Sequence, residues 1–262
     1  MSGNNHLSVV ILAAGQGSRM KSSRPKVLHP LAGKALLQHV LDSAAELAPQ
    51  KLVVVYGHGG EQVRQAIRDE AIVWAEQKEQ KGTGHAVQQA MPAVADEHMV
   101  LILYGDVPLT NATTLAELVR QVNDRQMALL SVHLDNPSGY GRIVRDGHGK
   151  VQCIVEEKDA SDAQRAISEI NTGILAVSAR HLKGWLGQLK NNNAQGEYYL
   201  TDIIAMAVRD GIEVVTAHPA TEEEVMGVNS RAQLARLLTP MTSSSVAGCA
   251  VTTSIPSCTA MA

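Results

Sequence analysis

Two glycines and two basic residues follow the first apolar stretch of the chain. Gly15 and Gly17 come directly after residues 8–14, which read as a buried strand, and Arg19 and Lys26 come shortly after them. Glycine has no Cβ, so the backbone N–H groups of such a turn can approach an anion closely. With two permanent positive charges beside the turn, this stretch predicts a site for a polyphosphate and suggests that the protein handles a nucleotide.

The spacing of these glycines differs from the common phosphate-binding motifs. A dinucleotide fingerprint has a third glycine at the position that Met20 occupies, and no G-x-x-x-x-G-K-[ST] sequence is present. A G-x-G pair alone is weak evidence, because an ordinary tight turn also explains it. The polyphosphate hypothesis therefore depends on the whole string from Leu12 to Lys26, in which Pro25 restricts the backbone and helps to aim the Lys26 ammonium group.

Polar residues also follow two later apolar runs. Asp106 comes after residues 99–104 and could supply a carboxylate for Mg²⁺, which usually takes one or two protein oxygens besides phosphate oxygens and water. Gln77 follows another such run, and its amide offers a donor and an acceptor that match the imide edge of uracil. Gly82 can present backbone groups to the same base, and Thr83 could also cap the following helix. The simpler interpretations are that Asp106 forms a turn and that Gln77 is an exposed polar residue.

The elements that must position these residues alternate between strands and helices. Aliphatic runs predict strands at residues 8–14, 52–56, 72–75, 99–104 and 127–133. Apolar residues at helical spacing predict helices at residues 34–48, 61–69, 83–91 and 112–122. This alternation is typical of an α/β fold with a Rossmann-like, mostly parallel sheet covered by helices on both faces. Ligands of such sheets bind beyond the carboxyl ends of the strands, where Gly15, Gln77 and Asp106 are expected to meet.

After residue 134 the pattern changes. Strands close together in sequence are expected at residues 140–145, 151–157 and 170–177. They predict a smaller, partly antiparallel lobe over about residues 134–178, within one domain that spans residues 1–238. Helices at 181–189 and 198–209, a strand at 213–217 and a last helix at 230–238 are expected to follow. Ser230 is the expected N-cap of that helix, and Pro240 is expected to end the pattern. Residues 239–262 carry no charge and are rich in Ser, Thr and Ala, which is typical of a disordered tail.

Composition excludes several classes of protein. The 262 residues are 45% hydrophobic, which suits one large α/β domain or two small ones. With 23 basic and 26 acidic residues the net charge is −3, so no basic field points to nucleic acid or to a membrane surface. The N-terminus lacks the features of a signal peptide. The three cysteines form no C-x-x-C pair, so we expect a reduced, cytoplasmic protein.

The string from Leu12 to Lys26 resembles the signature of the sugar-nucleotide pyrophosphorylases, with Ser18 where that family has threonine. Further motifs agree with this resemblance: VYGHGG at 55–60, EQ at 76–77, GTGHA at 82–86, YGDVPL at 104–109, GYGRI at 139–143, INTGI at 170–174, NNNAQGEYY at 191–199 and GVN at 227–229. In this order they are similar to the N-terminal half of the bacterial bifunctional N-acetylglucosamine-1-phosphate uridylyltransferases / glucosamine-1-phosphate acetyltransferases. The resemblance covers about residues 7–238.

The resemblance implies an activity and a set of site residues. Uridylyl would be transferred from UTP to N-acetylglucosamine 1-phosphate, giving pyrophosphate and UDP-N-acetylglucosamine, which in that family feeds peptidoglycan and lipopolysaccharide synthesis. Arg19 and Lys26 would be catalytic, and Asp106 and Asn229 would hold Mg²⁺. The implied substrate-binding residues are Leu12, Ala13, Ala14, Gly15, Gln77, Gly82, Thr83, Tyr104, Gly105, Gly141, Glu156, Asn171 and Asn229. One residue is inserted near Gly147, so the role of Glu156 depends on the pattern realigning after it.

The implied reaction needs no general base. A phosphate monoester has a second pKa of about 6, so the attacking oxygen is already anionic near neutral pH. Catalysis then reduces to alignment and charge neutralisation. Two alternatives stay open: a pyrophosphorylase for another sugar or nucleotide, and a non-catalytic nucleotide-binding remnant. The family's C-terminal β-helix acetyltransferase domain, which makes its members homotrimers, has no counterpart in the printed sequence, so this fragment is expected to be monomeric and to lack acetyl transfer.

Overall fold

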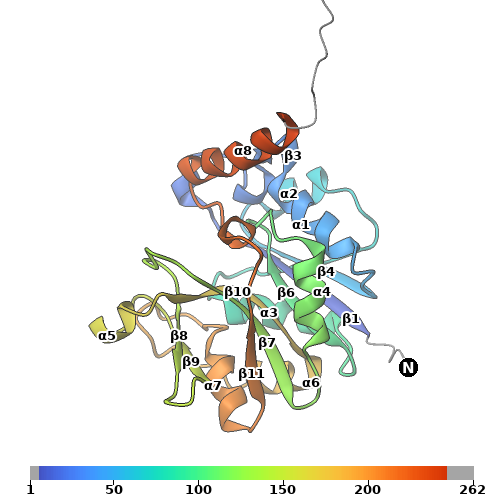
Figure 1. Cartoon of the computed structure of the whole chain (residues 1–262). Coiled ribbons are helices and arrows are strands. Elements are labelled where there is room, and N and C mark those ends of the chain that lie inside the picture. Colours follow the sequence, from blue (N-terminus) through green and yellow to red (C-terminus); the bar gives the residue numbers. More distant parts are fainter. Residues whose placement is uncertain (1–5, 247–262) are drawn as a thin grey trace, which may run out of the picture.

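The structure, a computed structural model, describes residues 6–246. Its centre is a nine-stranded sheet with the strand order β11-β7-β10-β6-β1-β4-β5 and with β8 and β9 attached at the side (Figure 1). Four neighbouring strands run parallel: β6 (Met99–Tyr104), β1 (Leu7–Ala13), β4 (Lys51–Tyr56) and β5 (Ile72–Glu76). The aliphatic runs therefore form strands within a residue or two of the predicted limits, and the predicted α/β class is confirmed.

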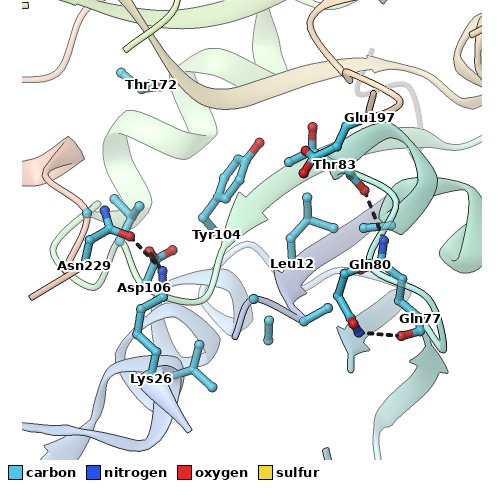
Figure 2. A pocket seen from close by; sticks show the side chains of 18 of the residues that line it. Leu12, Lys26, Gln77, Gln80, Thr83, Tyr104, Asp106, Thr172, Glu197 and Asn229 are labelled. Carbon is cyan, nitrogen blue, oxygen red and sulfur yellow. Dashed lines mark hydrogen bonds and ion pairs between the residues drawn. The ribbon is translucent and has the colours of Figure 1, made fainter. Parts of the chain in front are cut away.

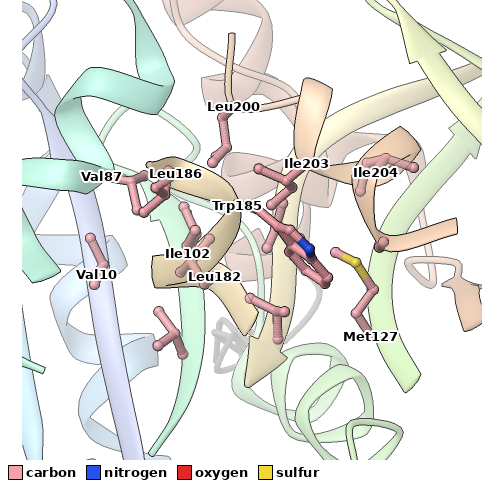
Figure 3. Packing of buried hydrophobic residues seen from close by; sticks show 14 of the residues in the cluster. Val10, Val87, Ile102, Met127, Leu182, Trp185, Leu186, Leu200, Ile203 and Ile204 are labelled. Carbon is pink, nitrogen blue, oxygen red and sulfur yellow. The ribbon is translucent and has the colours of Figure 1, made fainter. Parts of the chain in front are cut away.

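Helices cover both faces of this sheet. On one face lie α1 (Leu36–Ala45), α2 (Gly60–Ala66) and α4 (Ala112–Arg120). On the other lie α3 (Thr83–Ala90), α6 (Ala179–Leu186) and α7 (Asp202–Arg209), whose packing against the sheet around Trp185 is shown in Figure 3. Successive residues of β1 alternate between the two faces, since Val10 packs on the α3 side and Val9 on the α1 side. Burial on both faces explains why the strands read as continuous apolar runs.

The second half of the chain extends the same sheet. It adds β7 (Gln126–His133), β10 (Glu169–Ser178) and β11 (Glu213–Ala217). The prediction placed residues 170–177 in the smaller lobe, but β10 lies between β6 and β7 and runs antiparallel to both. Its apolar residues serve both cores: Ile174 packs on one face and Leu175 on the other. The side lobe itself is formed by β8 (Arg142–Arg145), β9 (Val151–Val155) and α5 (Asp162–Arg165).

The described residues also include short elements: the 3₁₀ helices η1 (Ser18–Met20), η2 (Lys26–Leu28), η3 (Met91–Ala93) and η4 (Glu222–Val225), and the hairpin β2 (Pro30–Leu31) and β3 (Lys34–Ala35). The last helix, α8 (Arg231–Val246), begins as predicted, because the Ser230 hydroxyl accepts a hydrogen bond from Gln233 N at 3.2 Å. Its predicted end is wrong, since α8 continues through Pro240. A proline removes one backbone donor from a helix but does not by itself end it. The rest of the predicted tail, with Cys249 and Cys258, lies outside the described residues.

The sheet changes direction beside β1. After β1 the chain builds β4 and β5 on one side and then returns to build β6 on the other. The last residues of the two central strands are neighbours, since Leu12 pairs with Tyr104 and Gly105 N donates to Leu12 O at 2.9 Å. In open α/β sheets such a switch point opens a crevice at the carboxyl edge. None of the helices in the described part of the chain combines the length and the apolar character that a membrane span requires.

Candidate functional site

A cavity of about 410 Å³ lies at this carboxyl edge, where the loops after β1, β5 and β6 meet. It brings together most of the residues predicted from the sequence: Leu12, Ala13, Ala14, Gly15, Lys26, Gln77, Gly82, Thr83, Tyr104, Asp106 and Asn229. Figure 2 shows two groups of polar side chains at its ends, Lys26 with Asp106 and Asn229 at one and Gln77 with Gln80 and Thr83 at the other. Leu12 and Tyr104 lie between them.

The glycine-rich loop allows Lys26 to reach the cavity. Gly17 has a left-handed φ of 62°, and a Cβ placed on it would lie 2.6 Å from Lys26 Cβ. A larger residue at position 17 would therefore displace the lysine stem. At the end of the Lys26 side chain, the ammonium group donates to Asp106 Oδ2 at 2.5 Å and to Asn229 Oδ1 at 3.0 Å. The side chains of Lys26 and Asp106 are 13% and 12% exposed, so this charge pair is largely shielded from water.

The oxygens of Asp106 and Asn229 fit a small hard cation, because both already converge on the positive charge of Lys26. Their backbones are fixed, since Val228 N donates to Asp106 O at 2.8 Å and Asn229 N donates to Gln233 Oε1 at 2.8 Å. Among the described residues no three His, Cys, Asp or Glu side chains gather where they could hold a metal ion. A metal here would need phosphate oxygens or water for its other ligands.

The other end of the cavity presents an amide. Gln77 is only 3% exposed, and its Nε2 donates to Gly82 O at 3.0 Å. That bond fixes the amide plane and leaves Oε1 as an acceptor. Gly82 has a φ of 104°, and a Cβ on it would lie 2.7 Å from Tyr198 O, so the loop passes close to the chain at Tyr198. A backbone carbonyl and a buried amide are therefore both held in place at this end of the cavity.

The hydroxyl of Thr83 does not cap α3, contrary to the prediction. The helix begins at Thr83 with Gly82 in the cap position and no side-chain bond there. Thr83 Oγ1 instead accepts from Leu200 N at 3.1 Å, while Gly84 N donates to Tyr198 O at 2.8 Å. The Thr83 hydroxyl therefore accepts a hydrogen bond from a backbone N–H that is distant in sequence, and not from the first turn of its own helix. These bonds attach the loop before α3 to the segment before α7.

Tyr104 occupies the middle of the cavity at the end of β6. Burial raises the pKa of its hydroxyl well above the usual value, and the nearby carboxylates of Glu156 and Asp106 add to this effect. The phenol therefore stays neutral at physiological pH and can donate a hydrogen bond to a ligand.

The predicted sugar-binding residues form a neighbouring group that does not line the cavity itself. Asn171 N donates to Gly141 O at 2.9 Å, and a Cβ on Gly141 would lie 3.4 Å from Glu156 Oε2. A bulge between Asn171 and Leu175 interrupts β10 at this point. Such bulges re-aim side chains beside functional sites. Arg19, exposed on η1, and Gly105 are likewise absent from the lining.

Several lining residues were not predicted as site residues: Gln80, Tyr140, Thr172, Glu197, Val225 and Gly227. Tyr140, Thr172, Glu197 and Gly227 belong to sequence motifs that were recognised as wholes, so their presence in those motifs was the available signal. The position of Gln80, three residues after Gln77, was a weaker one. Nothing in the local sequence of Val225 distinguishes it from a core valine.

Comparison with known proteins identifies the family of the chain. The profile of the family described as "MobA-like NTP transferase domain" matches residues 9–239. The chain is 60% identical over 231 residues to the "Bifunctional protein GlmU" of Dechloromonas aromatica and 61% identical over 231 residues to that of Marinobacter nauticus. Each alignment covers 88% of this chain and 51% of the relative. The chain thus spans about half the length of the curated relatives it matches.

Solved structures share the fold at low identity. A nucleotidyl transferase from a Methanothermobacter species aligns with a TM-score of 0.66 and 19% identity, over 92% of this chain and 100% of the other. A candidate glucose-1-phosphate thymidylyltransferase from Bacillus anthracis aligns with a TM-score of 0.71 and 18% identity, over 89% and 94%. At this identity the likeness establishes the fold alone, whereas the profile covers most of the sequence. The chain therefore belongs to the family of MobA-like NTP transferase domains.

Proposed function

We propose that this domain transfers uridylyl from UTP to N-acetylglucosamine 1-phosphate, releasing pyrophosphate and forming UDP-N-acetylglucosamine. The main support is the cavity, which holds the Lys26 ammonium group with oxygens of Asp106 and Asn229 at one end and the buried amide of Gln77 at the other. The identity of about 60% to proteins named GlmU supports the choice of substrates.

The proposed reaction is an in-line displacement. An oxygen of the sugar phosphate attacks the α-phosphorus of UTP, the bond from that phosphorus to its bridging oxygen breaks, and the electron pair leaves with pyrophosphate. No covalent enzyme intermediate forms. Lys26 would hold the α-phosphate and the sugar phosphate, and Arg19 would close over the leaving pyrophosphate, because a guanidinium can bridge two oxygens. Because the nucleophile is already ionised, the tasks of the protein are to align the reactants and to neutralise the charge on the phosphoryl oxygens.

Nucleotidyltransferases of this family generally use a divalent metal ion. We propose Mg²⁺, held by Asp106 and Asn229, because both offer oxygens and Mg²⁺ prefers a sparse protein shell. When bound, it would neutralise charge that develops on the phosphoryl oxygens.

Gln77, Gly82 and Thr83 would recognise uracil, and Gly15 with the residues before it would approach the phosphates. Gly141, Glu156 and Asn171 would bind the sugar, whose hydroxyl groups suit a carboxylate and an amide. The proposed compartment is the bacterial cytoplasm, where UTP is available, and the 262-residue chain is proposed to be a monomer.

A substrate-exchange assay tests the proposal. The purified chain is incubated with Mg²⁺, UTP and N-acetylglucosamine 1-phosphate, and pyrophosphate release is compared with that from dTTP and glucose 1-phosphate. We expect release with the first pair at least about a hundredfold faster, and loss of turnover in Asp106→Ala with an unchanged circular dichroism spectrum. Faster release with the second pair would identify a different pyrophosphorylase, and binding of UTP without any turnover would identify a non-catalytic module.

A further inference from the structure

One polar contact beside the site has no place in the proposed mechanism. Thr201 Oγ1 donates to Glu156 Oε1 at 2.8 Å, joining residues that are 45 positions apart in the sequence. The threonine is only 9% exposed, and neither residue lines the cavity. A hydroxyl has a single hydrogen to donate, so this bond commits it to one carboxylate oxygen.

Thr201 stands at the start of α7, but its side chain does not cap the helix. Thr201 is the N-cap residue of α7, but its backbone is already helical (φ −61°, ψ −21°), so its hydroxyl does not accept a hydrogen bond from the first turn. Asn111 and Ser161, which do cap α4 and α5 through their side chains, have extended backbones instead. The hydroxyl at the start of α7 therefore makes no capping bond and donates to Glu156 instead.

The backbone before α7 is fixed by the opposite end of the site. Leu200 N donates to Thr83 Oγ1 at 3.1 Å, and Tyr198 N donates to Lys81 O at 2.8 Å. Thr201 thus follows directly on a segment that is attached to the loop proposed to recognise uracil. These bonds hold the backbone from which the Thr201 side chain reaches Glu156.

We propose that Thr201 is a positioning residue, which holds one oxygen of Glu156 so that the other oxygen is presented to a hydroxyl group of the sugar. This inference rests on the proposed function, because it assigns Glu156 to the sugar. Glu156 Oε2 supports it, since that oxygen is the one near Gly141, another residue proposed to bind the sugar.

The Thr201 hydrogen bond also affects the pKa of Glu156. Burial raises the pKa of Glu156, and the carboxylates of Asp159, Asp202 and Glu197 raise it further. The Thr201 hydrogen bond acts in the opposite direction, because it stabilises the ionised form. Tyr104 also faces this carboxylate and is neutral. Without the Thr201 hydroxyl, Glu156 is expected to take up a proton at a higher pH.

The test compares Thr201→Val, which has the same shape without the hydroxyl, with Thr201→Ser, which keeps it. Thr201→Val is expected to raise the KM for N-acetylglucosamine 1-phosphate roughly tenfold, or about 1.4 kcal/mol, and to leave the KM for UTP within about twofold. Thr201→Ser is expected to restore the wild-type value. In the pH profile of kcat/KM for the sugar phosphate, the acidic limb should move to higher pH in Thr201→Val. The substrate phosphate titrates equally with both enzymes, so it does not contribute to this difference.

Thr114→Val is the matched control. Thr114 Oγ1 also donates to a carboxylate, Glu224 Oε2, at 2.8 Å, but on α4 and outside the cavity lining. It is expected to leave both KM values unchanged. Equal losses in Thr201→Val and Thr201→Ser, or an equal rise in both KM values, would overturn the proposal.

A carboxyl ¹³C NMR titration of Glu156 gives a readout that needs no turnover. A higher pKa in Thr201→Val than in the wild type is expected, and an unchanged pKa would contradict the positioning role. If the substrate-exchange assay shows no turnover while the pKa of Glu156 still rises in Thr201→Val, the proposed function is wrong, but the positioning of Glu156 by Thr201 is confirmed.

Discussion

Lys26 is held in the position that a metal ion would share. Its ammonium group bridges Asp106 Oδ2 and Asn229 Oδ1, residues that come from separate parts of the chain. Two like charges cannot occupy the same pair of oxygens, so a divalent ion must displace the lysine or bind beside it. Displacement would free the ammonium group for the phosphate that arrives with the metal.

Lys26→Met is accordingly expected to bind Mn²⁺ more tightly than the wild type when no nucleotide is present, by about tenfold or more, because the competing cation is gone. Turnover is expected to fall, since the proposed phosphate contact is lost. Electron paramagnetic resonance of free Mn²⁺ measures the affinity.

Lys34→Met serves as the control for that variant, because it removes a lysine that pairs with the exposed Asp42 away from the cavity. In the double variant Lys26→Met/Asp106→Ala the gain should disappear. Equal Mn²⁺ affinity in Lys26→Met and the wild type would show that the lysine does not compete for these oxygens.

At the scale of elements, the loop before α3 depends on the segment before α7. Gly82 combines a left-handed backbone with a close approach to Tyr198, and Gly84 N donates to the same residue. The loop thus has no room to move outward without breaking contacts with the segment before α7. The shape of the loop therefore follows from packing between elements rather than from the local sequence. The same packing places Gly82 O, which accepts the hydrogen bond from Gln77.

Gly82→Ala is expected to raise the KM for UTP about tenfold or more, because the new Cβ must push the loop away from Tyr198 O. Gly211→Ala is a matched control: Gly211 also has a positive φ, of 76°, but a Cβ there meets nothing within 4 Å. It should lower stability by about 1 kcal/mol through backbone strain alone. Steady-state kinetics together with thermal denaturation separate the two effects, and an unchanged KM in Gly82→Ala would exclude this loop from base recognition.

At the scale of the whole molecule, the cavity exists because the strand order reverses at β1, with β4 added on one side of it and β6 on the other. The loops after β1 and β6 diverge there, while two apolar cores, one on each face, hold the strands that carry them. A nucleotide bound in the cavity would contact loops from both sides of the reversal. Its binding energy would therefore add to the stability of the entire sheet.

UTP with Mg²⁺ is expected to raise the midpoint of thermal unfolding by several degrees. A ligand at a hundred times its Kd stabilises the folded state by about 2.7 kcal/mol. CTP is the comparison, because it lacks the imide that Gln77 is proposed to recognise, and a smaller shift is expected with it. Circular dichroism at increasing temperature measures both midpoints, and equal shifts would exclude Gln77 as the residue that distinguishes the bases.

The strands and most helices could be predicted because their signals are local. Aliphatic runs, helical spacing and glycine turns marked β1, β4, β5 and β6 to within a residue or two, and placed Gly15, Gln77 and Asp106 at the edge that binds ligands. The end of α8 was missed, because a proline only weakens a helix whose neighbouring turns can still form.

The sequence by itself determined the class of fold, the family motifs and the types of residue available for phosphate chemistry. Only the tertiary structure decided where β10 enters the sheet, which hydroxyl holds Glu156, and that Lys26 meets Asn229, 203 positions away. The reason is physical. Backbone preferences and apolar periodicity act over a few residues, whereas strand order and side-chain pairing depend on the packing of both faces of the sheet at once.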